Sequence, residues 1–189
     1  YSSGSHGVVN LTNSTWKAEN QGNPRDVTVG VSGWGEVHAT TSQLSVDNLV
    51  IAANVGSVGD LSASGGVLTV EQNLTVGSAG TGTLSLTNSA SAQIGGTVSI
   101  GASGNGTFEA TDATFHAPEL FVAENAGSTG SATVAGGAMT LTGELHVGAR
   151  GAGTFTLEGG ATLNTDKGNM GFASGSTGTI NVLDGTWTN

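Results

Sequence analysis

The side chains best suited to chemistry in this sequence are two pairs of carboxylates. Glu36 and Asp60 each come one residue after a glycine, in two successive stretches of similar sequence. Glu119 and Glu144 form a second pair of this kind, each directly before a leucine. If such stretches stack as neighbouring strands, the members of a pair lie roughly 5 Å apart. Carboxylates at that spacing can catalyse proton transfer on a glycan or hold a cation. The interpretation we favour is that they are ordinary acidic residues on the solvated surface.

Other patterns that could bind a ligand are incomplete. The loops "GSAGTG", "GASGNG" and "GARGAG" read G-x-x-G-x-G, whereas a dinucleotide site needs G-x-G-x-x-G opening a helix and a phosphate loop needs G-K-[ST]. The Gly-Gly runs lack the aspartate of calcium-binding β-rolls. The four histidines form no H-x-H or H-E-x-x-H motif, and they fall in different stretches: His6, His38, His116 and His146. We therefore expect no catalytic residue, cofactor or metal.

The composition excludes several classes of partner. The net charge is −10 with only four Lys and Arg residues, which argues against nucleic acid as a partner. No apolar run approaches the roughly 20 residues that span a bilayer, so we expect no membrane insertion. Cysteine is absent, and 33 glycines accompany many Ser, Thr, Ala and Val residues. This composition disfavours helices and suits strands joined by turns.

The elements that would position these side chains come from an internal repeat. A glycine precedes each alternating run, and its spacing gives a period of about 24 residues. The eight glycines are Gly7, Gly35, Gly59, Gly82, Gly106, Gly130, Gly153 and Gly178. The residues two and four positions after each glycine are apolar in every unit. Six positions after it stands Thr41 in the second unit, and in the other units a residue that tolerates a sharp turn: Asn13, Gly65, Asn88, Asp112, Gly136, Gly159 and Asp184.

Two further alternating segments follow in each unit. The second begins nine residues after the glycine with an apolar residue such as Trp16, except that Ser91 and Thr162 indicate a slip of one residue. In the seventh unit we expect Met170 and Phe172 to be the inward pair of the third segment. Each unit thus predicts three short strands in which alternate residues point inward.

Eight units that each contain three strands in the same order predict an all-β fold, a parallel β-helix or solenoid. Coils stack strand on strand, and the crossover preference makes the helix right-handed. We expect a single domain over residues 1–189, with a loop insertion near 20–25. Its units begin near Gly4, Gly33, Gly56, Gly80, Gly104, Gly127, Gly151 and Gly175. The leucine-rich repeat is the alternative solenoid, but its L-x-x-L-x-L-x-x-N pattern is absent.

The units "VGSAGTGTLSL", "IGASGNGTFEA" and "VGARGAGTFTL" carry a family likeness. They resemble the Gly-rich β-strand repeats of bacterial autotransporter passengers and related large surface proteins. The resemblance covers nearly the whole chain and implies an extracellular β-helical stalk or adhesin at the bacterial surface, with surface glycans or host proteins as partners. It transfers no catalytic residue.

The two ends of the chain are out of phase with its own coil. Tyr1 to Gly4 align with Phe172 to Gly175, the tail of a third strand, and the chain stops after a second strand. Uncapped solenoid ends recruit further strands, so we expect either an excerpt of a longer array or a subunit that associates end to end into a fibre. Tyr1, Trp16 and Trp187 are the predicted end contacts. The alternative function is a glycan-binding or polysaccharide-processing module that uses the paired carboxylates.

Overall fold

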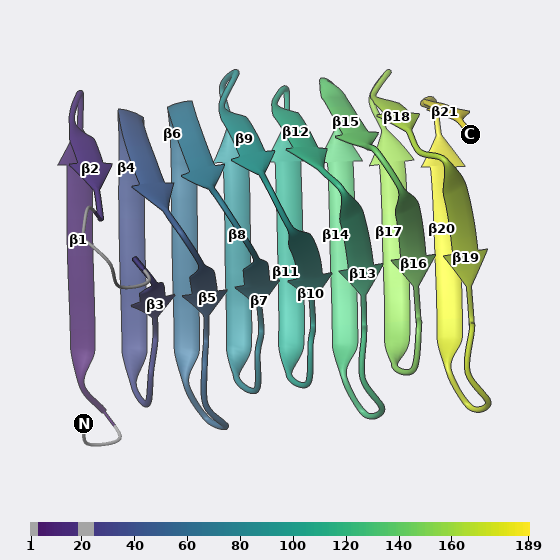
Figure 1. Ribbon diagram of the computed structural model, residues 1–189, viewed down its shortest axis with the longest axis horizontal. Helices are drawn as coiled ribbons and strands as arrows, with labels where there is room; N and C mark the ends of the chain where they lie inside the picture. Colours follow the sequence, from purple (N-terminus) through teal and green to yellow (C-terminus); the bar gives the residue numbers. More distant parts are fainter. Residues whose placement is uncertain (1–3, 19–24) are drawn as a thin grey trace.

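The structure, a computed structural model, describes residues 4–18 and 25–189. All strand pairings within these ranges are parallel, and no helix occurs in them. The strands stand side by side along the long axis of a rod, with the N-terminal coils at the purple end and the C-terminal coils at the yellow end (Figure 1). Tyr1 and residues 20–24 of the expected loop insertion lie outside the described residues.

Three parallel ladders build the rod. The first contains β1 (His6–Thr12), the first halves of β4 (Trp34–Val46) and β6 (Val58–Val70), β8 (Thr81–Thr87), β11 (Asn105–Thr111), β14 (Thr129–Ala135), β17 (Ala152–Glu158) and β20 (Thr177–Leu183). The second contains β2 (Thr15–Lys17), the second halves of β4 and β6, β9 (Ser91–Ile94), β12 (Thr114–Ala117), β15 (Ala138–Leu141), β18 (Thr162–Asn164) and β21 (Thr186–Thr188). The third contains β3 (Val27–Val29), β5 (Leu49–Ile51), β7 (Leu74–Val76), β10 (Thr97–Ile100), β13 (Glu119–Val122), β16 (Glu144–Val147) and β19 (Lys167–Met170).

The described strands therefore make seven complete turns of a β-solenoid and two strands of an eighth. This confirms the fold class and the period of about 24 residues. The first-ladder register joins the eight glycines that define the repeat, from Gly7 opposite Gly35 to Gly153 opposite Gly178. The handedness stays a prediction.

Inward side chains form continuous apolar columns, because in-register stacking places equivalent residues of successive coils on one another. In the first ladder Leu61 pairs with Leu84 and Leu84 with Phe108, and all three are buried. The slip of one residue is confirmed in the second ladder, where Ala92 and Leu163 are buried. Each such side chain contributes about 1.5–3 kcal/mol of hydrophobic stabilisation only when the next coil covers it, so the coils stabilise one another.

The corner between the first and second strands needs a left-handed backbone in every coil. The φ angle is positive at Thr41 and at all seven predicted turn residues: Asn13, Gly65, Asn88, Asp112, Gly136, Gly159 and Asp184. Thr41 is the exception in residue type, since a β-branched residue rarely adopts its φ of 50°. In β4 and β6 the strand continues through this corner, so two of the predicted strands merge into one in each of these coils.

The glycine ladder has a steric cause. A Cβ atom on Gly106 would lie 2.1 Å from the backbone nitrogen of Gly101, and one on Gly82 would lie 2.4 Å from that of Gly77. Both neighbours belong to the corner between the third strand and the next first strand. The backbone of this third corner therefore packs directly against the first ladder, at a separation that only glycine allows.

The third corners come in two lengths. Four are short, with four residues each: 30–33, 77–80, 101–104 and 148–151. Three are long, with six residues each: 52–57, 123–128 and 171–176. In each long corner the last residue is a serine whose hydroxyl donates a 2.7 Å hydrogen bond to a backbone carbonyl three residues earlier: Ser57, Ser128 and Ser176.

The last complete coil corrects one expectation. The inward pair of β19 is Gly168 and Met170, not Met170 and Phe172, because Gly168 pairs with Leu145 in the third ladder. The ring of Trp187, at the inward position of β21, fills the space that Gly168 leaves: two of its carbons lie 2.5 Å from where a Cβ of Gly168 would stand. Phe172 instead lies in the third corner, with 78% of its surface exposed.

Trp16 holds the same inward position in the first coil that Trp187 holds in the last. It pairs with Leu44, just as Trp187 pairs with Leu163, and both indole rings are partly buried against the core. An open hollow of about 450 Å³ lies at this end of the described coils, and Trp16, Val29 and Val37 are among the residues that line it.

Candidate functional site

The first carboxylate pair lies on the outer face of β4 and β6. Glu36 and Asp60 are register partners, as the repeat predicts. The Glu36 carboxylate accepts a 3.0 Å hydrogen bond from His6 Nε2 and a 2.9 Å bond from His38 Nε2. His38 Nδ1 lies 2.8 Å from the hydroxyl of Ser62. Since a carboxylate only accepts, His38 donates from Nε2, and neutral His38 accepts from Ser62 at Nδ1.

The pKa values of the two carboxyl groups are shifted in opposite directions. The hydrogen bond from His38, assisted by the one from His6, holds the pKa of Glu36 below its ordinary value. Partial burial raises the pKa of Asp60, and the nearby charge of Glu36 adds to this rise. The pair therefore contains one carboxylate tied to imidazoles and one carboxyl group that binds its proton more readily.

The chain Ser62–His38–Glu36 has the residue types of a nucleophile, a base and an orienting carboxylate. Hydrolysis would also need donors aimed at a developing oxyanion. The described backbone on either side, in β4 and β6, is paired in parallel ladders, so this strand surface provides no such hole. The cluster was missed in the sequence, although it was readable: His38 stands two residues after Glu36, and Ser62 holds the same offset in the next unit.

The second carboxylate pair opens β13 and β16. The Glu144 carboxylate accepts a 2.7 Å hydrogen bond from Asn169 and lies 3.3 Å from His146 Nε2 and 3.4 Å from Lys167 Nζ. The bond from Asn169 is the main cause of a pKa of Glu144 below its ordinary value. Glu119 stands opposite Thr97. The oxygens of Glu144 are thus directed toward the next coil rather than toward solvent alone.

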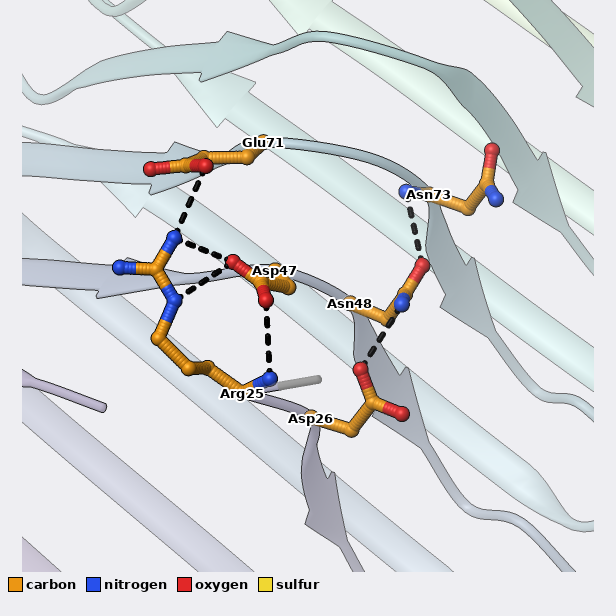
Figure 2. A network of polar contacts seen from close by, with 6 residues as sticks. All are labelled: Arg25, Asp26, Asp47, Asn48, Glu71 and Asn73. Atoms are coloured by element: carbon orange, nitrogen blue, oxygen red, sulfur yellow. Dashed lines mark hydrogen bonds and ion pairs between the residues drawn. The ribbon is translucent and has the colours of Figure 1, made fainter. Parts of the chain in front are cut away.

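A third polar network was not anticipated, and it joins the first three coils. Arg25 forms an ion pair with Asp47, to which Arg25 Nε donates a 2.7 Å bond and the Arg25 backbone N–H a 2.9 Å bond. The guanidinium also lies 2.8 Å from the carboxylate of Glu71 (Figure 2). The hydrogen bond from Arg25 holds the pKa of Asp47 below its ordinary value. One guanidinium thus ties three successive coils together at the corner before the third ladder.

An amide ladder continues this network next to Arg25. The side chain of Asn48 donates a 2.8 Å bond to Asp26 and accepts a 3.1 Å bond from the backbone of Asn73 (Figure 2). The Asn73 side chain in turn accepts from the backbone of Thr97 at 3.0 Å. Each amide satisfies a backbone group that the corner leaves unpaired, so this network stabilises the turn.

Among residues 4–18 and 25–189, no group of three or more His, Asp or Glu side chains is arranged to hold a metal ion. The same ranges contain no helix long and apolar enough to cross a membrane. Neither protein-family models, nor curated proteins, nor solved structures match this chain.

Proposed function

We propose that the chain is a non-enzymatic structural β-solenoid, serving as a segment of a surface adhesin or stalk, or as a subunit of an extracellular fibre at the bacterial surface. The observation that carries this proposal is the pair of open strand edges. Within the described residues β1 pairs only with β4, and β20 pairs only with β17. Each edge strand continues a parallel ladder of the same phase, so it can accept one more coil.

The apolar residues at these edges support the proposal. The inward edge residues Val9 of β1 and Val182 of β20 are 37% and 44% exposed. Their register partners in the neighbouring coils, Val37 and Leu157, are buried. The occupant is either a further coil of a longer chain or the opposite end of a second copy. The Gly-rich units that resemble those of bacterial surface proteins favour an extracellular location.

A polysaccharide-processing role for Glu36, Asp60, Glu119 and Glu144 is less well supported. Glu36 is bonded to two histidines, and Glu144 contacts Asn169, Lys167 and His146. A carboxylate that transfers a proton to or from a substrate needs an oxygen atom that faces the substrate.

Sedimentation of the purified chain over a range of concentrations tests the proposal. We expect association into elongated particles that a double substitution, Val9→Lys with Val182→Lys, weakens about tenfold or more, since lysine in the apolar column at each edge disfavours stacking of a further coil. Val55→Lys is the matched control, because Val55 is 88% exposed in a third corner away from both edges. A chain that stays monomeric, from a gene that encodes no further repeats, would contradict both versions.

A further inference from the structure

The third corners of three successive coils form a notch. The corner 148–151 is short, and the corners on either side of it, 123–128 and 171–176, are long. The second residue of each corner is Glu124, Ala149 and Phe172 in turn. A small side chain therefore stands between two large ones, whose coils are about 10 Å apart. Elsewhere in the described residues no short corner has long corners on both sides.

The notch is a pocket of about 230 Å³. Ala149 forms its floor, with Glu124 and Phe172 as its walls. The outer side chains of the third ladder close it on one side. There Phe121 and His146 stack in parallel, with ring centroids 4.4 Å apart and planes within 2°.

The polar groups of the pocket are both donors and acceptors. Glu124 is oriented by a 2.7 Å hydrogen bond from Ser99, and Asn125 donates to Ser103 at 3.2 Å. Arg150, at the rim, makes no ion pair or side-chain hydrogen bond with the residues that the structure describes. The pocket thus combines one oriented carboxylate, one amide and one available guanidinium beside an exposed aromatic ring.

The walls are held in place before any ligand arrives. Ser128 and Ser176 each donate a 2.7 Å hydrogen bond to a carbonyl within their own long corner, from Asn125 and Ala173. Ser128 is buried, so the hydroxyl cannot exchange this bond readily for water. A site whose walls are already ordered loses little conformational entropy on binding.

We propose that this pocket binds one neutral pyranose ring of a glycan. The C–H face of the ring packs on Phe172, while its hydroxyls donate to Glu124 and accept from Arg150 and Asn125. The charges of Glu124 and Arg150 cancel, and the net charge of −10 disfavours acidic saccharides. The volume lies below the roughly 300–1,000 Å³ of pockets for drug-sized ligands, so the pocket fits a single ring.

Titration of the ¹⁵N-labelled chain with the methyl glycosides of glucose, galactose, mannose and N-acetylglucosamine tests this inference. For at least one of them we expect saturable amide shifts at Asn125, Arg150 and Phe172, with a dissociation constant in the millimolar range because one ring covers little surface. Phe172→Ala, which removes an exposed ring, should weaken binding about tenfold. Ala149→Phe fills the notch and should abolish saturation.

The matched control is Ala53→Phe, which adds the same bulk to the second residue of the long corner 52–57, away from the notch. It should bind like the unmodified chain. The proposal is overturned if none of the four glycosides causes saturable shifts, if binding survives Ala149→Phe, or if methyl glucuronide binds more tightly than every neutral ring. Because Phe172 is largely exposed, its alanine variant keeps the test valid even if Ala149→Phe does not fold.

Discussion

The contact between Trp187 and Gly168 predicts a compensating pair of substitutions. Gly168 occupies a column that otherwise carries only Val or Leu, and the indole of Trp187 lies where that side chain would be. The indole is fixed by a 3.0 Å hydrogen bond from its Nε1 to Thr165. Gly168→Leu alone should therefore overpack the last coil and cost about 1–3 kcal/mol.

Trp187→Ala alone should cost about 2 kcal/mol, below the 3–5 kcal/mol of a fully buried Trp because the indole is only partly buried. The double variant should recover much of the loss, since the leucine refills the column. The expected coupling energy is about 1–3 kcal/mol.

The assay combines thermal unfolding with amide hydrogen exchange of β18 and β21, because an end coil can fray without global unfolding. Both single variants should lose protection in these strands, and the double variant should regain it. If Gly168→Leu costs the same with and without the indole, the ring does not substitute for the missing side chain and the reasoning is refuted.

The remaining predictions concern the corners, the glycine ladder and pH. Thr41→Asn should raise stability by about 1 kcal/mol, and so raise the melting temperature by about 2–4 °C, by relieving a β-branched residue at positive φ; a lower melting temperature would contradict this. Gly106→Ala should cost at least about 3 kcal/mol in chemical denaturation, whereas Gly7→Ala, whose Cβ would meet nothing within 4 Å, should change little; equal effects would count against the steric explanation. The lowered pKa of Asp47 gives stability that is full above about pH 4 and is lost as the pH falls through the folded-state pKa. In Arg25→Gln the melting temperature should therefore fall less steeply as the pH is lowered below about 4. The same pH dependence as in the unmodified chain would refute the role of this ion pair.

Most of the fold was predictable because one rule applies in every coil. Period-2 alternation and a turn residue at a fixed offset determine the strands, the corner and the register together. The prediction was wrong at β19 because Gly168 is compensated by Trp187, which comes from the following coil. Local alternation favoured Met170 and Phe172 as the inward pair, and only the stacked coils reveal that an indole takes the place of a side chain.

The polar sites were only partly predictable for a related reason. Register alone places Asp60 opposite Glu36. The hydrogen bonds that lower the pKa of Glu36 come from His6 and His38, and they depend on the direction of each side chain, which the sequence does not reveal. The network of Arg25 was not anticipated because it joins three coils through one long side chain. The length difference between third corners was readable in the sequence, but its meaning required knowing that these corners lie side by side.

The parallel ladders also have a mechanical consequence. Their hydrogen bonds point along the rod, so a force that pulls one end away from the other loads them one coil at a time. Peeling one coil of about 24 residues releases about 80 Å of extended chain, at roughly 3.3–3.6 Å per residue. A tethered rod of this kind would lengthen in steps rather than break at once. It would dissipate the energy of each pull and rebuild its coils from the intact ladder when the load falls.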